Sequence, residues 1–263
     1  MNVDDVALEV FEAIKSASQI QPFSERGINL SNSDAYQVAR ELFRLRGWEN
    51  VGRKIGFTNR CIWPIYSVSE PMWGAISNSS VVYAENNNAV VNLGEFCEPR
   101  IEPEIVIGLK ECPQNDPSIE QVVKCLDWVA PGFEIVDSIY PNWKFSVPDT
   151  IAAGGLHGKL IIGQKVKPTK NLNELLINQR VCLSKNSEII EKGSGDKVLN
   201  GPISAIQYLL RGIKKELNES RLSDGDIVTT GTLTDAKPIY SGETWSALFE
   251  GVINTTLKIK FLS

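Results

Sequence analysis

The chain has 263 residues, of which 42% are hydrophobic and 22% charged, which is ordinary for a globular protein with a substantial core. The formal net charge of −5 and the pI of about 5.2 exclude the basic footprint that nucleic-acid-binding domains carry. No apolar run approaches the ~20 residues that a membrane span needs. The acidic start, with Asp4 and Asp5, is unlike a signal peptide.

The cysteines indicate the compartment. Their number is odd, and their spacing matches no metal-binding pattern. We therefore expect reduced thiols and a cytoplasmic protein. The five residues are Cys61, Cys97, Cys112, Cys125 and Cys182.

The first 50 residues predict a helical N-terminal region. Apolar side chains recur at helical spacing in two stretches. Ser31 or Ser33 is a candidate cap for the second helix, and Gly47 is a candidate end. The apolar positions are Val6, Val10, Phe11 and Ile14, and then Tyr36, Ala39, Leu42 and Phe43.

Strand patterns dominate residues 51–263. Two helices are expected between them, over about 118–128 and about 202–217, the second beginning with Pro202 at a favoured first position. Residues 257–261 alternate as a half-buried strand. We predict an α+β protein in which the helical region, residues 1–50, precedes an antiparallel or mixed β domain, residues 51–263.

Two glutamates interrupt an apolar run at residues 101–105. In a strand, side chains two residues apart point the same way, so Glu102 and Glu104 share a face. Two like charges among apolar neighbours repel each other and lose hydration, and a divalent cation would relieve both costs. The alternative is an exposed sheet face that carries solvated glutamates.

A third carboxylate, Glu134, interrupts another short apolar run at residues 132–137. Three carboxylates without a nearby histidine or cysteine suit Mg²⁺ or Mn²⁺ and not zinc or copper. Asp137 is a rival ligand, but in a continuous strand it faces the side opposite to Glu134. A metal held this way would chelate a small oxygen-rich molecule.

Lys54 lies in a predicted strand between Gly52 and Gly56, which permits the close approach of backbone or ligand. A metal and burial would both lower the pKa of a lysine, which could then act as a general acid or base. The alternative is a surface lysine, as most lysines are. Its neighbour Arg53 would face the other way and have a structural role.

Six short blocks in this order resemble the 2-oxopent-4-enoate hydratase and 4-oxalocrotonate decarboxylase family, within the fumarylacetoacetate hydrolase superfamily. Together they extend over nearly the whole chain. They are residues 52–58 (GRKIGFT), 100–105 (RIEPEI), 134–138 (EIVDS), 193–202 (GSG leading to NGP), 225–228 (GDIV) and 231–234 (GTLT).

The resemblance implies a mixed β-roll with an N-terminal helical region, assembled as a homo-oligomer. It implies a Mg²⁺ or Mn²⁺ site built by Glu102, Glu104 and Glu134, and a catalytic role for Lys54. It further implies that a small 2-oxo acid binds near the turn at residues 231–234, where Gly231 and Thr232 are candidate contacts.

The chain departs from the family pattern at two places. The hydratases usually carry an acidic residue at the position of Met72, so the nearby Glu70 is a candidate catalytic substitute. The family usually reads Ala-Asp-Asn where this chain has Ala152, Ala153 and Gly154. Part of the polar shell has changed, so the substrate or the reaction can differ from those of the namesake enzymes.

His157 is the only histidine. It is a candidate proton shuttle or substrate contact, because histidine titrates nearest neutral pH, and the alternative is a packed ring with satisfied nitrogens. The C–C hydrolases of the superfamily generally activate water with a His–Glu pair on an N-terminal lid. This chain has no histidine before residue 157, which argues against acylpyruvate hydrolysis by that route.

These observations favour a metal-dependent lyase. The chelated 2-oxo acid would be activated by a Lewis acid, and Lys54 would move protons during hydration of a 2-oxopent-4-enoate-type acid to a 4-hydroxy-2-oxo acid. Decarboxylation of a 4-oxalocrotonate-type acid uses the same electron sink and stays open. A catalytically altered paralogue that only binds a metal–oxoacid complex also stays open.

Overall fold

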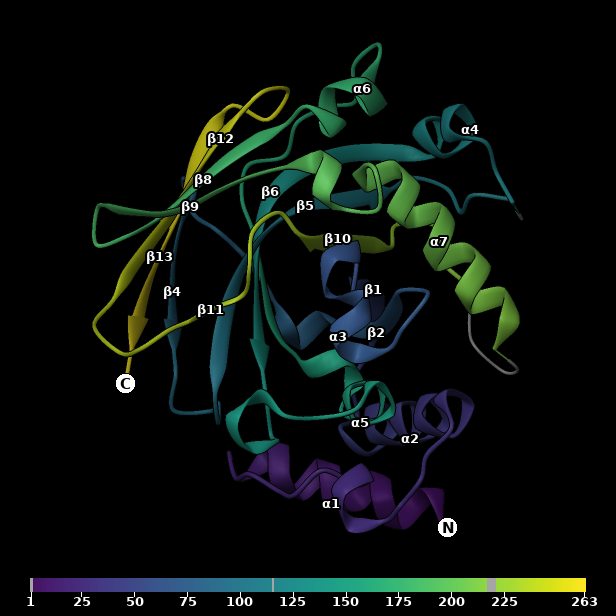
Figure 1. The fold of residues 1–263 in the computed structure, drawn as a ribbon. Helices are drawn as coiled ribbons and strands as arrows, with labels where there is room; N and C mark the ends of the chain where they lie inside the picture. Colours follow the sequence, from purple (N-terminus) through teal and green to yellow (C-terminus); the bar gives the residue numbers. More distant parts are fainter. Residues whose placement is uncertain (1, 115, 217–220) are drawn as a thin grey trace.

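The computed structural model describes residues 2–114, 116–216 and 221–263. In it the N-terminal region forms two helices, α1 (Val3–Lys15) and α2 (Asn32–Leu45), which lie side by side below the sheets in Figure 1. The side chain of Ser31 accepts a hydrogen bond from the backbone amide of Asp34, so the first of the two candidate caps begins α2.

The larger sheet carries eight strands, and its ladders are mixed. β1 pairs parallel with β10, and β3 pairs parallel with β7, while the remaining neighbours are antiparallel. In spatial order the strands are β2 (Met72–Ser77), β1 (Asn50–Gly56), β10 (Ile227–Thr232), β5 (Pro99–Leu109), β6 (Leu126–Asp137), β7 (His157–Ile162) and β3 (Val81–Tyr83), with β11 (Lys237–Pro238) beside β5.

The smaller sheet lies beside the larger one in Figure 1 and has five strands. In spatial order they are β4 (Asn88–Asn92), β13 (Thr255–Leu262), β12 (Thr244–Glu250), β8 (Arg180–Lys185) and β9 (Glu188–Ser194). In β13 the buried residues Leu257, Ile259 and Phe261 alternate with exposed ones, which confirms the predicted final strand.

Short helices connect the strands, and α7 packs against β10 and β2. The α-helices are α3 (Trp63–Tyr66), α4 (Ile119–Lys124), α5 (Val147–Ala152), α6 (Leu172–Ile177) and α7 (Pro202–Lys215). The 3₁₀ turns are η1 (Ser24–Arg26), η2 (Arg60–Ile62), η3 (Asn78–Ser80), η4 (Pro141–Trp143), η5 (Gly154–Leu156) and η6 (Gly195–Lys197). Among the described residues, the helices lack the combination of length and apolar character that crossing a membrane requires.

The helix predicted over 118–128 is wrong in its second half. α4 ends at Lys124, and Leu126 already begins β6. β6 pairs with β5 along almost its whole length, and this ladder outweighs a helical periodicity of only three turns. The helix predicted over 202–217 is α7, and residue 217 lies outside the described residues.

The predicted class is confirmed, since an N-terminal pair of helices precedes two sheets that are mixed in direction. Buried residues of both parts belong to one hydrophobic cluster, which contains Val10 of α1, Leu42 of α2 and Ile105 of β5. The division into residues 1–50 and 51–263 stays a prediction.

Candidate active site

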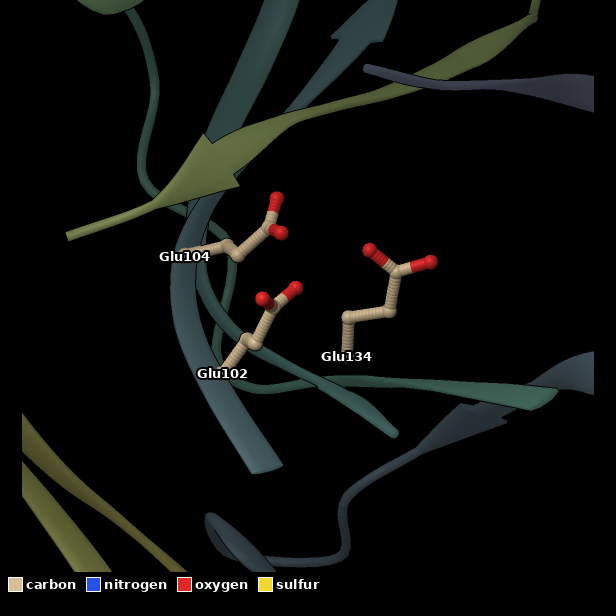
Figure 2. A group of neighbouring side chains, drawn as sticks. All are labelled: Glu102, Glu104 and Glu134. Atoms are coloured by element: carbon tan, nitrogen blue, oxygen red, sulfur yellow. The ribbon is translucent and has the colours of Figure 1, made fainter. Parts of the chain in front are cut away.

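Three carboxylates meet between β5 and β6. Glu102 and Glu104 are two residues apart on β5, and Glu134 of β6 is the register partner of Glu102. Figure 2 shows both β5 side chains extending toward the space beside the carboxylate of Glu134. One oxygen from each residue lies within 4.8 Å of the other two, which is a spacing that a single cation can bridge.

The protein buries these charges. Glu104 and Glu134 are 0% exposed, and Glu102 is partly buried, so the alternative of solvated glutamates on an exposed face is wrong. Glu104 Oε2 accepts hydrogen bonds from the Gly231 amide, at 2.8 Å, and from the Thr229 hydroxyl. Its other oxygen, Oε1, has no hydrogen-bond partner among the described residues.

Two basic side chains contact Glu134. Lys54 Nζ lies 3.1 Å from Glu134 Oε2 and donates to the carbonyl oxygen of Gly155 at 3.2 Å. Lys54 is only 4% exposed, so the surface-lysine alternative is wrong. His157 Nδ1 lies 2.8 Å from Glu134 Oε1, while its Nε2 lies 2.9 Å from the hydroxyl of Ser80. Both ring nitrogens of His157 are therefore engaged.

The cluster shifts the pKa values of its members. Burial raises the pKa of Glu102 to about 7. The charge of Lys54 opposes this shift, and the charge of Glu134 adds to it. Burial and the charges of the two other glutamates raise the pKa of Glu104 well above its ordinary value. Burial also raises the pKa of Glu134, but Lys54 and His157 outweigh it and lower that pKa below its ordinary value.

For Lys54, burial alone would lower the pKa. The three carboxylates outweigh burial, so the pKa is raised above its ordinary value, and the lowering expected beside a bound metal stays a prediction. A divalent ion among the glutamates would cancel much of this attraction. The pKa of Lys54 therefore depends on the charge of the three carboxylates, and a cation or a proton that neutralises them would lower it.

The residues present fit a hard divalent cation. The donor set is all oxygen, two of the three carboxylates are fully buried, and Glu104 Oε1 has no hydrogen-bond donor within the described part of the chain. Unpartnered buried carboxylate oxygens are costly in a protein interior, and a cation removes that cost. Asp137 is not a rival, because its carboxylate accepts the backbone amides of Cys97 and Glu98.

The polar groups of the turn at residues 231–234 already have partners within the protein. The amide of Gly231 is used by Glu104, and a side chain at this residue would collide with Thr58, since a Cβ would lie 1.9 Å from Thr58 Oγ1 at a φ of 105°. The Thr232 hydroxyl donates to the carbonyl oxygen of Thr234 at 2.8 Å. A substrate that binds Thr232 therefore has to exchange with this internal bond.

A cavity of about 720 Å³ opens onto Lys54 and Glu102. Thr232 and Arg100 line it, and its other walls are largely apolar. The apolar and aromatic lining residues include Phe57, Tyr66, Met72, Trp143 and Phe145. The carboxylate cluster thus lies beside a space large enough for a small organic acid.

A family comparison agrees with this geometry. Residues 64–258 match the fumarylacetoacetate hydrolase C-terminal family. The chain belongs to this family. The chain is 28% identical over 253 residues to the 2-hydroxyhexa-2,4-dienoate hydratase of Comamonas testosteroni, covering 92% of each chain. It is also 28% identical over 235 residues to a 4-oxalocrotonate decarboxylase of Pseudomonas sp. strain CF600, covering 88% of this chain and 86% of that one.

A solved structure confirms the fold of this family member. The 4-oxalocrotonate decarboxylase of Pseudomonas putida G7, complexed with magnesium and adipate, superimposes with a TM-score of 0.89 at 24% identity, covering 99% of this chain and 97% of that one. The resemblance read from the six sequence blocks is confirmed, and so is the predicted β-roll of the fumarylacetoacetate hydrolase type.

The first family departure lies on the cavity wall. Met72 lines the cavity beside Lys54. Glu70, the expected substitute, instead pairs with Lys215 at 2.5 Å, and its side chain is 52% exposed. It lines a different hollow, so the structure does not bring Glu70 together with Lys54 and the three glutamates.

The second departure lies behind the site. Ala153 is buried at the end of α5, and Ala153 and Gly154 line a separate cavity together with His157. The next residue, Gly155, holds Lys54 through its carbonyl oxygen. The backbone of this segment therefore still supports the site, although the family's two polar side chains are missing from it.

Three residues that the sequence analysis did not single out complete the site. Thr229 bonds Glu104, Ser80 bonds His157, and Arg100 lines the cavity. Arg100 was accessible to sequence reasoning, because it lies two residues before Glu102 and so shares its face of the strand. Thr229 and Ser80 are far away in the chain, and only the fold brings them close.

Proposed function

We propose that this protein is a divalent-metal-dependent lyase that hydrates a 2-oxopent-4-enoate-type acid to a 4-hydroxy-2-oxo acid. The observation that carries the proposal is the carboxylate trio of Glu102, Glu104 and Glu134, two of them fully buried, with Lys54 at 3.1 Å from Glu134. The relatives named as hydratases, which are similar over most of the chain, support it.

The three glutamates would hold Mg²⁺ or Mn²⁺. When bound, such an ion would supply a Lewis acid that polarises the 2-oxo group and the double bond conjugated to it. Gly231 and Thr229 keep Glu104 in place, and His157 does so for Glu134. Because these contacts are already formed, ion binding would need little rearrangement.

Lys54 would move the protons. Its ammonium group faces both Glu134 and the cavity, within reach of a substrate bound beside the glutamates. For a 2-hydroxypenta-2,4-dienoate, transfer of the hydroxyl proton to C5 gives a conjugated enone, and water then adds at C4. Lys54 is the proton carrier that we assign to this transfer.

The remaining contacts would orient the acid. Thr232 lies at the cavity wall and can exchange its bond to Thr234 for one to the substrate carboxylate. We assign His157 to Glu134 and not to the substrate, because both of its nitrogens are engaged away from the cavity of Lys54. The apolar wall suits the carbon chain of a dienoic acid.

Decarboxylation of a 4-oxalocrotonate-type acid is the second candidate. The same residues would serve it: the bond between C5 and the distal carboxylate breaks, CO₂ leaves, and the bonding electrons pass through the double bond into the 2-oxo group, which is protonated to give a 2-hydroxydienoate. The observation that favours it is the cationic Arg100, which lines the cavity two residues before Glu102 on β5. The similar decarboxylase of P. putida G7 was solved with adipate, a six-carbon dicarboxylate, which supports this candidate.

We further propose a cytoplasmic homo-oligomer. All five cysteines are free thiols, which suits a reducing compartment. Large apolar side chains such as Ile65, Val90 and Ile189 are exposed and could be covered by a second copy. Light scattering on the purified protein tests the assembly.

Turnover tests the reaction. With Mg²⁺, we expect loss of the diene absorbance of 2-hydroxypenta-2,4-dienoate without release of CO₂. Loss only with a dicarboxylic analogue, together with CO₂, would favour the decarboxylase. Tight oxalate binding without turnover of either acid would favour a protein that only binds, and cleavage of an acylpyruvate would favour a C–C hydrolase.

A further inference from the structure

A second cavity, of about 250 Å³, lies on the other side of β1 from Lys54. Successive side chains of a strand point to opposite faces, and Arg53 lines this cavity while Lys54 lines the larger one. The other walls come from α2, β2 and the segment between α5 and β7. The two cavities share no lining residue within the described part of the chain, so a ligand in one leaves the other open.

The walls of this second cavity are positively charged. Three arginines line it, whereas no aspartate or glutamate does among the described residues. The arginines are Arg40, Arg46 and Arg53, and we call the space that they line the arginine cavity. Guanidinium groups around an enclosed space attract anions, because the surrounding protein screens their charge less than water does.

Arg46 has an aromatic neighbour in place of an acidic one. Its guanidinium carbon lies 3.6 Å from the centroid of the Trp48 ring, and the structure gives the guanidinium neither an ion pair nor a hydrogen bond with any described residue. Glu95 lies near enough to act on its charge, but Glu95 lines a neighbouring cavity and pairs with Lys159. Burial therefore lowers the pKa of Arg46 to about 10, against the charge of Glu95.

The arginine cavity also has aromatic walls. Trp73 stacks on Tyr36 with the ring centroids 4.2 Å apart, and Phe43 meets Trp48 edge-on at 5.8 Å. The indole nitrogen of Trp73 is buried and has no hydrogen-bond acceptor among the described residues. A cation and an N–H donor that both lack acceptors, around an aromatic space, suit a ligand with an anionic group on a flat apolar body.

We propose that the arginine cavity binds a small organic monoanion, a carboxylate carried by a planar apolar group, and that Arg46 receives the carboxylate. Such a ligand would supply the counter-ion that this half-buried guanidinium lacks. A volume of about 250 Å³ is at the small end for ligand pockets, so the ligand is about the size of benzoate. The site adjoins the carboxylate cluster, because His157 lines the cavity and contacts Glu134.

Benzoate and benzamide test this proposal, because they share the ring and the size and differ in charge. In ligand-observed NMR titrations of metal-free protein in EDTA, benzoate should bind about ten- to a hundredfold more tightly than benzamide. Without a divalent ion the three glutamates repel a carboxylate, so the result does not depend on the proposed function. Equal affinities, or absence of benzoate binding at millimolar concentration, would overturn the proposal.

Variants assign the preference to Arg46. Arg46→Gln should remove most of it while leaving the affinity for benzamide within about threefold, and Arg46→Lys should keep part of it because the charge remains. The matched control Arg44→Gln alters an arginine of the same helix whose side chain is 71% exposed, and should change neither affinity. A preference that survives in Arg46→Gln, or that disappears in Arg100→Gln instead, would contradict the assignment.

A second pair of variants decides the matter if Arg46→Gln does not fold. Ala153 is buried and lines the arginine cavity. Ala153→Asp would place a carboxylate there and should weaken benzoate binding about tenfold more than Ala153→Asn, which has the same size without the charge. Equal effects of the two variants on benzoate binding would argue against the site. Melting curves establish that each variant is folded.

Discussion

The two sheets handle charge in opposite ways. In β13 of the smaller sheet, the buried residues Leu257, Ile259 and Phe261 alternate with exposed ones, and both lysines of this strand are exposed. In β5 and β6 of the larger sheet, both faces are largely buried, yet Glu104 and Glu134 lie inside. Burying a carboxylate costs free energy, so the larger sheet is where the chain departs from what stability alone favours.

The difference separates residues that hold the fold from residues that perform chemistry. Substitutions in the smaller sheet should change the free energy of unfolding and leave ligand binding intact. Substitutions in the glutamate cluster should weaken ligand binding and leave the free energy of unfolding largely unchanged. The predictions below test this separation, beginning with the largest expected effect.

The removal of Lys54 should have the largest effect on turnover. Lys54→Met keeps the length and removes the proton carrier, so the rate of diene loss should fall by about 10²- to 10⁴-fold. Mg²⁺ affinity should be retained, because the competing cation beside Glu134 is gone. The control Lys167→Met alters a lysine whose side chain is 77% exposed. Unchanged turnover in Lys54→Met would remove Lys54 from the mechanism.

The smaller sheet should show the opposite pattern. Phe261 is fully buried in β13, and Phe261→Ala should lower the free energy of unfolding by about 3 to 5 kcal/mol. The folded fraction should bind Mg²⁺ with wild-type affinity. Denaturant titration measures the first quantity and calorimetry the second. A large loss of Mg²⁺ affinity in Phe261→Ala would show that residues of the smaller sheet also determine metal binding.

His157 tests whether the contact to Glu134 matters for the metal. An asparagine can place its amide nitrogen near the position of Nδ1, which contacts Glu134, while a glutamine reaches the position of Nε2, which contacts Ser80. We expect His157→Gln to weaken Mg²⁺ binding by about ten- to a hundredfold and His157→Asn to retain most of it. Equal affinities of the two variants would argue for a packing role alone.

Glu70 should matter least. Its pair with Lys215 is solvent-exposed, so Glu70→Gln should change the free energy of unfolding by less than about 1 kcal/mol. Turnover should stay within about twofold, because Glu70 does not line the cavity of Lys54. A loss of turnover comparable to that of Lys54→Met would restore the catalytic role expected from the sequence.

The sequence predicted the placement of the three glutamates, because the information for it is local. Alternation in a strand placed Glu102 and Glu104 on one face, and the break in an apolar run marked Glu134. The same alternation also applies to Arg100, which was left without a role. The expectation for Glu70 rested on its nearness in the chain to Met72, but the short stretch between them turns its side chain to the surface.

Contacts between distant segments could not be predicted in this way. Thr229 and Gly231 reach Glu104 only because β10 pairs with β5, and Ser80 reaches His157 only because η3 lies beside β7. The true end of α4 is a related case, since pairing of β6 with β5 overrides the local helical pattern. The sequence pattern predicts faces, while the fold decides which faces meet.

Calorimetric titration of Mg²⁺ into the metal-free protein tests the central claim most directly. The account predicts one site per chain whose affinity falls by about a hundredfold in Glu104→Gln, since a carboxylate ligand is lost, and is unchanged in Glu188→Gln, an exposed carboxylate of β9. Absence of Mg²⁺ and Mn²⁺ binding to the wild type, or equal binding to both variants, would contradict it.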